Sequence, residues 1–174
     1  GTGRAAILEL EDQMRQISDG VEPKPKEYPY QIAYNVFPHI DTFLENGYTR
    51  EEWKMLEETQ KIMHAPNMVV SATCVRVPVA IGHSEAVHVE FSYPMDPEEA
   101  RRLLSDFQGV TVLDDIEQNG YPMPILVAGR DDVLVGRIRK DVSHDNGLTM
   151  WIVGDNLRKG AALNAIQIAG ELVL

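Results

Sequence analysis

The stretch Val133-Leu-Val-Gly-Arg-Ile-Arg-Lys-Asp-Val-Ser-His-Asp-Asn-Gly-Leu-Thr-Met-Trp-Ile-Val153 decides the fold, because its pattern predicts two strands joined by a turn. The turn signal is Asp145-Asn-Gly147, and the predicted strands are Val133 to Arg139 and Leu148 to Val153. The second strand carries apolar side chains on both of its faces. We therefore expect a sheet with helices on one face and a second body, such as a partner subunit, on the other.

Further elements are expected before and after this hairpin. Alternating side chains predict strands at Met68 to Val77 and Glu85 to Phe91. Because helices and strands do not alternate strictly, their order favours an α+β fold, with a mixed, largely antiparallel sheet that has helices on one face and uses the other for dimerisation. Apolar spacing and end signals predict helices that end at Asp19-Gly20, run from Thr49 to about His64, run from Asp96-Pro97 to Phe107, and run from about Leu157 to Val173.

The composition is typical of a globular domain. With 174 residues, of which 44% are hydrophobic and 25% charged, the chain is expected to form one domain over residues 1–174. Its net charge of −11 argues against nucleic acid or a membrane surface as the main partner. No apolar run approaches the roughly 20 residues that span a bilayer, so we expect a cytoplasmic protein. The one cysteine, Cys74, is expected to be buried and inert.

The second predicted helix has a distinctive start. In Thr49-Arg-Glu-Glu52, the Thr49 hydroxyl and the Glu52 carboxylate can satisfy backbone N–H groups of the first turn as a capping box. Glu51 and Lys54 then lie together on the polar face of the helix, one turn apart. They can form a surface ion pair of little consequence, or they can bind a ligand that carries both charges.

Arg76 and His83, seven positions apart, are candidates for a ligand site. An arginine matches a carboxylate with two parallel hydrogen bonds, and a histidine can exchange a proton near neutral pH. From spacing alone, the residues favour a strand end followed by a turn over a ligand site. We expect no metal site, because His83 and Glu85 share one face of their strand while His88 lies on the other.

Six motifs follow one another along nearly the whole chain. They are Asn35-Val-Phe-Pro-His-Ile40, Tyr48-Thr-Arg-Glu-Glu-Trp-Lys-Met55, Glu58-Thr-Gln-Lys-Ile-Met63, Ala72-Thr-Cys-Val-Arg-Val-Pro-Val79, Gly82-His-Ser-Glu85 and Asp155-Asn-Leu-Arg-Lys-Gly-Ala-Ala162. Together they resemble the second half of the aspartate-semialdehyde dehydrogenases, the substrate-binding and dimerisation domain. The resemblance implies the fold of the C-terminal domain of glyceraldehyde-3-phosphate-dehydrogenase-like enzymes.

The resemblance also implies an activity and a role for particular residues. Members of this family use NADPH to reduce β-aspartyl phosphate to aspartate semialdehyde and phosphate, through a cysteine thioester, on the route to lysine, methionine and threonine. By resemblance, His83 is the acid/base residue, and the substrate residues are Arg76 for the carboxylate, Glu51 for the amino group and Lys54 for the phosphate. Asn156 matches a residue near the nicotinamide. The implied partners are a second copy, as a homodimer, and the protein's own N-terminal NADP-binding domain.

The chain departs from the family pattern in what it does not contain. The family's nucleophilic cysteine, its NADP-binding domain and a glutamine that orients the thioester precede the part that this chain matches, and Cys74 is not that nucleophile. We therefore expect the chain alone to be inactive. One alternative is a stand-alone dimerisation scaffold without catalysis. Another is a reductase for a different acyl phosphate, such as N-acetylglutamyl phosphate; Glu51 argues against it, because a blocked amine needs no carboxylate partner.

Overall fold

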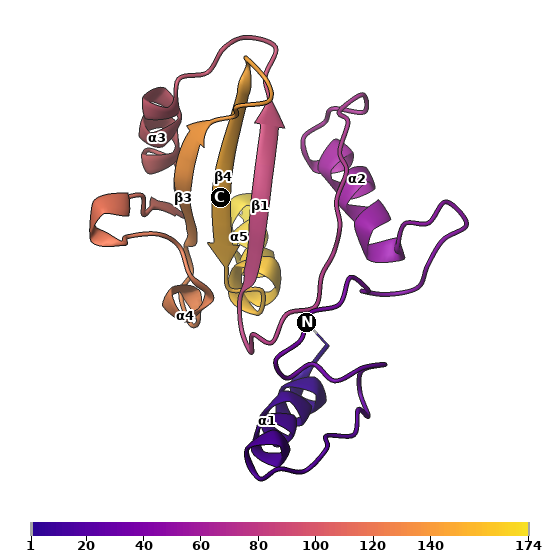
Figure 1. Ribbon diagram of the computed structural model, residues 1–174. Coiled ribbons are helices and arrows are strands. Elements are labelled where there is room, and N and C mark those ends of the chain that lie inside the picture. The colour runs from indigo at the N-terminus through magenta and orange to yellow at the C-terminus, as the bar shows by residue number, and fades with distance from the viewer. Residues whose placement is uncertain (1, 174) are drawn as a thin grey trace. The chain divides into compact units, whose positions relative to one another are not determined.

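The computed structural model describes residues 2–173, and the chain divides at Ala80 into two compact units (Figure 1). Residues 2–80 form the first unit, and the second begins at Ile81. The expectation of one domain over residues 1–174 stays a prediction. No helix among the described residues is long and apolar enough to cross a membrane.

The first unit begins with helix α1, Arg4–Ser18, which packs on the extended connector that follows it. Its buried Gln13 accepts hydrogen bonds from the N–H groups of Ile32 and Ala33, at 2.9 and 3.1 Å. The carboxylate of Glu9 likewise accepts from the N–H groups of residues 26 and 27. The connector, residues 21–33, contains three prolines and pairs with no strand within residues 2–173. The side chains of Glu9 and Gln13 therefore supply acceptors that its N–H groups need. The apolar core of this unit consists of Leu10, Ile32, Ala33 and Phe37.

Helix α2, Arg50–Ile62, begins with the predicted capping box. The N–H of Glu52 donates to the hydroxyl of Thr49 at 3.3 Å, and the N–H of Thr49 donates to the Glu52 carboxylate at 2.8 Å. The second carboxylate oxygen of Glu52 accepts from the N–H of Cys74, also at 2.8 Å. One buried glutamate therefore both starts the helix and holds a segment 22 residues further along the chain.

The strand predicted at Met68 to Val77 is wrong. Within residues 2–173, this segment pairs only through an isolated bridge. There the N–H of Arg76 donates to the Phe37 carbonyl at 2.9 Å, and the N–H of Phe37 donates to the Arg76 carbonyl at 3.2 Å. Alternation of side chains describes an extended backbone, whereas a strand also requires a partner along its length. Cys74, predicted to be buried, is half-buried.

The second unit is built on a four-stranded sheet in the order β1-β4-β3-β2. Strand β4 pairs antiparallel with β1 and β3, and β2 pairs parallel with β3, so the sheet is mixed and largely antiparallel, as predicted. Strand β2 was not predicted, because three residues are too few to show a period. The strands are β1, His83–Glu90; β2, Val110–Val112; β3, Val133–Lys140; and β4, Gly147–Gly154.

Both faces of β4 are covered in part, as its apolar pattern indicates. Helix α3, Pro97–Ser105, packs on one face, around the buried Ala100, Val135, Ile138 and Leu148. The short helix α4, Pro124–Val127, packs on the opposite face, where Val127, Leu134 and Val153 are buried against the half-buried Trp151. The remaining helical segments are η1, Ile116–Gln118; the π-helical turn η2, Arg158–Ala162; and α5, Leu163–Val173.

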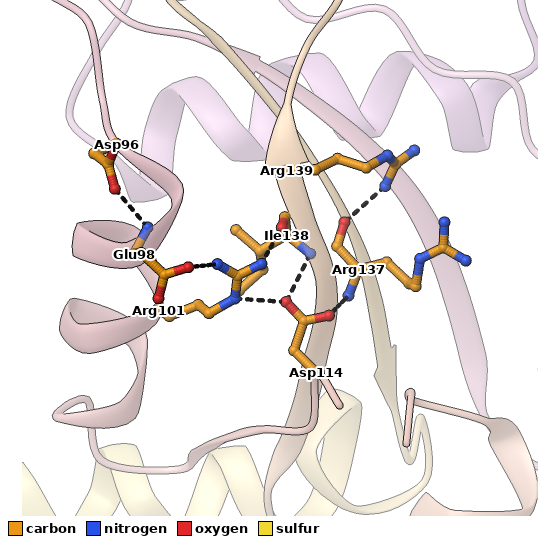
Figure 2. Close-up of polar contacts among 7 residues, drawn as sticks. All are labelled: Asp96, Glu98, Arg101, Asp114, Arg137, Ile138 and Arg139. Atoms are coloured by element: carbon orange, nitrogen blue, oxygen red, sulfur yellow. Dashed lines mark hydrogen bonds and ion pairs between the residues drawn. The ribbon is translucent and has the colours of Figure 1, made fainter. Parts of the chain in front are cut away.

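A bulge in β3 at residues 136–139 is held by one carboxylate (Figure 2). Asp114 accepts from the N–H groups of Arg137 and Ile138, at 2.6 and 3.1 Å, and from the Arg101 guanidinium at 2.7 Å. Arg137 has a φ of 55°, the left-handed region that costs energy for any residue with a side chain. Arg101 also donates to the carbonyl of Ile138, so this network joins α3 to the bulge and supports the strained turn.

Candidate functional site

Glu51 and Lys54 form a direct ion pair on α2. Their carboxylate and ammonium are 3.1 Å apart, and both side chains are partly exposed. The hydrogen bond and the charge of Glu51 raise the pKa of Lys54 above its ordinary value. The capping box occupies Glu52, whereas the side chains of Glu51 and Lys54 bind only each other within residues 2–173. The pair can therefore exchange its mutual contact for a ligand's amine and phosphate.

Arg76 is held through its backbone and by an aromatic ring. Both of its backbone hydrogen bonds are made with Phe37, and its guanidinium carbon lies 5.9 Å from the centre of the Tyr28 ring. Stacking on an aromatic face restricts the orientation of the guanidinium while leaving its in-plane donors available. This arrangement suits the recognition of a carboxylate.

His83 is the first residue of β1, and its position depends on the glycine before it. Gly82 has a φ of 104°, and a Cβ at this residue would lie 3.2 Å from the Cβ of Pro124. The N–H of Gly82 donates to the side-chain oxygen of Asn156 at 3.0 Å. The sheet register explains this contact, because His83 is paired with Gly154 and the residues just outside the pair meet at the same end.

Asp155, next to Asn156, is the most constrained carboxylate at this end of the sheet. Its side chain, 3% exposed, accepts from the N–H groups of Gly129, Leu157 and Arg158, at 2.8, 2.8 and 3.1 Å. Burial alone would raise the pKa of Asp155, but these hydrogen bonds, with the charge of Arg158, lower it below its ordinary value. Asp155 therefore accepts from the backbone at the start of the C-terminal helical segment and also ties it to the loop after α4.

The structure brings four of the five predicted site residues together in two pairs, whereas Arg76 has no hydrogen bond or ion pair with Glu51 or Lys54 within residues 2–173. Glu51 contacts Lys54 in the first unit, where Arg76 also lies, and His83 is linked to Asn156 through Gly82 in the second. The contribution of Gly82 and the contact of Asp155 with Gly129 were not predicted from the sequence. A glycine directly before His83 and an aspartate directly before Asn156 are the signals that could have indicated them.

Metal ligation has no support in this part of the molecule. Within residues 2–173, no three histidine, cysteine, aspartate or glutamate side chains come together in a way that could hold a metal ion. His88 instead contacts Asp141, with 3.0 Å between its Nδ1 and the carboxylate.

Known proteins similar to this chain are found by both sequence and structure. Residues 1–159 match the family described as Semialdehyde dehydrogenase, dimerisation domain. The chain is 55% identical to an aspartate-semialdehyde dehydrogenase of Aquifex aeolicus over 174 residues, which cover 99% of this chain and 51% of that protein. An aspartate-semialdehyde dehydrogenase of Legionella pneumophila is 54% identical over 97% of this chain and 49% of its own length.

Among solved structures, aspartate semialdehyde dehydrogenase II of Vibrio cholerae, crystallised in complex with ASA, has a TM-score of 0.94 and 46% identity. That similarity covers 98% of this chain and 50% of the Vibrio chain. The chain thus spans about half the length of the relatives that it matches. Since the family match extends over most of the sequence, the chain belongs to the semialdehyde dehydrogenase dimerisation-domain family.

Proposed function

We propose that this chain is the substrate-binding and dimerisation domain of an NADP-dependent aspartate-semialdehyde dehydrogenase. The reaction reduces β-aspartyl phosphate to aspartate semialdehyde and phosphate, and it serves lysine, methionine and threonine biosynthesis. The observation that carries the proposal is the Glu51–Lys54 pair at 3.1 Å, because this substrate has both an amine and a phosphate to exchange for it. The high identity to enzymes of that name supports the same substrate.

Each candidate residue has a distinct task in this proposal. Glu51 binds the substrate amine, Lys54 the phosphate, and Arg76 the α-carboxylate through two parallel hydrogen bonds. His83 takes the proton of the attacking cysteine thiol, which belongs to a part of the protein outside this chain. It later supplies a proton to the leaving phosphate. Holding the substrate at three charged points also orients its acyl phosphate toward that cysteine.

The cofactor is bound mainly outside this chain. NADPH supplies a hydride to the reaction. Asn156 fits a supporting role in binding the cofactor. The side-chain oxygen of Asn156 already accepts from Gly82, whereas the side-chain NH2 group has no hydrogen-bond partner among residues 2–173. That amide can donate to a carbonyl oxygen of the cofactor.

The proposed partners follow the same assignment. The domain forms a homodimer through the face of its sheet and packs against the protein's own N-terminal NADP-binding domain. Nucleic acid and membranes are not partners, in keeping with the net charge of −11, and the protein is cytoplasmic.

The test is phosphate-dependent NADP reduction with aspartate semialdehyde, measured on the protein of the complete reading frame. His83→Ala is expected to lower kcat by about two orders of magnitude or more, the usual scale for an acid/base group. A matched control is His64→Ala, which removes an exposed histidine at the end of α2 and should leave kcat unchanged. Wild-type activity in His83→Ala would remove His83 from the reaction, and an inactive wild type would favour the scaffold.

A further inference from the structure

We infer that Asn156 is a positioning residue for His83, acting through the backbone of Gly82, in addition to any contact it makes with the cofactor. This inference rests on the proposed function, in which His83 transfers protons. The Asn156 side chain has two different ends, and the structure assigns a separate task to each.

The oxygen end of Asn156 faces the protein. Since the Gly82 N–H can only donate, the atom 3.0 Å away must be the side-chain oxygen, which fixes the orientation of the whole amide group. The NH2 end is thereby directed away from Gly82, and it makes no hydrogen bond within residues 2–173. Asn156 is therefore suited to bridge the backbone before β1 and a ligand.

Gly82 needs such an anchor because its own conformation is loosely restricted. Glycine occupies the left-handed region, here at a φ of 104°, without steric cost, but it also reaches many other conformations. On one side Gly82 is packed against Pro124 and Val127, which would lie 3.2 and 3.3 Å from an added Cβ. On its other side, the N–H of Gly82 donates to Asn156. Rotation about Gly82 would swing the imidazole of the next residue, His83.

The anchor is itself rigid. Asn156 directly follows Asp155, whose buried carboxylate accepts hydrogen bonds from three backbone N–H groups, those of Gly129, Leu157 and Arg158. One of these belongs to Gly129, in the loop that follows α4, the same helix that packs on Gly82. Asp155 thus connects the end of β4 to the loop after α4, and α4 packs against Gly82 at the start of β1. The hydrogen bond from Gly82 to Asn156 joins the start of β1 back to the end of β4.

Two substitutions separate the two ends of the side chain. Asn156→Asp keeps an oxygen for Gly82 and removes the NH2 donor, whereas Asn156→Ala removes both. The first readout is hydrogen exchange at the Gly82 amide in the full-length protein. Labelling isoleucine carbonyl carbons and glycine nitrogens for NMR restricts the signals to Ile-Gly amides, of which Ile81-Gly82 is the one in residues 1–174.

We expect Asn156→Ala to raise the exchange rate of the Gly82 amide at least tenfold and to lower kcat about tenfold at saturating NADP. Asn156→Asp should keep the exchange rate near that of the wild type and recover most of the kcat, while its KM for NADP stays elevated. The aspartate of Asn156→Asp accepts hydrogen bonds but does not donate them. If Asn156 acted only in cofactor binding, this variant would not recover kcat.

Three results would overturn the inference: an unchanged Gly82 exchange rate in Asn156→Ala, a raised rate with normal kcat, or an equal loss of kcat in both variants. Failure of the proposed function has a different signature. In that case the full-length wild type would not reduce NADP with aspartate semialdehyde at all, whereas the exchange rates would still show whether Asn156 anchors Gly82.

Discussion

Glu52 is the residue on which the first unit most depends. Its carboxylate is buried, and its two oxygens accept from backbone N–H groups of Thr49 and Cys74. The capping box was predictable because its partners are three residues apart, whereas the contact with Cys74 spans 22 residues. Local partners show in a sequence pattern, and distant ones depend on the path of the chain.

The stability of the protein is expected to depend on pH through Glu52. Hydrogen bonds from the N–H groups of Thr49 and Cys74 lower the pKa of this carboxyl below its ordinary value of 4.5. A group with a lowered folded-state pKa stabilises the fold above its unfolded pKa, and this contribution is lost as the pH falls through the folded value. Urea unfolding at pH 7 and at acidic pH should show a smaller acid loss in Glu52→Gln than in the wild type. Equal losses in the two proteins would contradict this.

Glu51 should be important for function and unimportant for stability. Its ion pair with Lys54 is partly exposed, so Glu51→Gln should change the free energy of unfolding by less than about 0.5 kcal/mol. In the full-length enzyme, kcat/KM for aspartate semialdehyde should fall about tenfold or more, since the amine loses a charged partner. The control is Glu58→Gln, an exposed glutamate on the same helix, with no such loss. An unchanged kcat/KM in Glu51→Gln would show that Glu51 and Lys54 form a surface ion pair without a role in binding. It would also remove the argument against an N-acetylated substrate, such as N-acetylglutamyl phosphate.

At the level of elements, the hairpin β3–β4 and the helices α1, α2 and α3 follow the periodic patterns of the sequence. The errors have physical causes. Strand β2 has only three residues, and the segment Met68 to Val77 alternates but lacks a partner strand. The π-helical turn η2 lies inside a stretch whose pattern predicts a continuous helix. Of the candidate site, residue types and local spacing were accessible, but the link from Asn156 to Gly82 spans 74 residues and depends on sheet register.

The bulge in β3 is expected to depend strongly on Asp114. This carboxylate is 4% exposed and pairs with Arg101 while accepting two N–H groups of the bulge. Asp114→Ala should lower the free energy of unfolding by about 2–4 kcal/mol, because it leaves two N–H groups of the bulge without their acceptor and removes the buried carboxylate that pairs with Arg101. Asp106→Ala, which removes one of the two exposed carboxylates that pair with Arg102, should cost less than about 1 kcal/mol. Chemical denaturation measures both, and similar losses would show that the network adds little.

At the level of the whole molecule, the proposed homodimer uses one face of the sheet. The sheet face that carries Trp151 also carries the exposed Ala86, its partner in the β1–β4 register. The full-length protein should sediment as a dimer at tens of micromolar, roughly the range of moderate association. Ala86→Arg should shift it toward monomer, since a charge would be buried in the interface. Val142→Arg, in the exposed β3–β4 turn, should not. A wild-type monomer at this concentration would contradict the proposed interface.

Strand β1, which begins with His83, is a terminal strand of the sheet. A terminal strand has a row of unpaired backbone N–H and C=O groups. A strand of another chain can pair with these groups and start an aggregate. Four of the eight residues of β1 are ionisable, namely His83, Glu85, His88 and Glu90, two on each face. Charges in such positions oppose the stacking of further strands. The strand that carries the proposed proton-transfer group thus also carries ionisable side chains on both faces, which oppose its growth into a fibre.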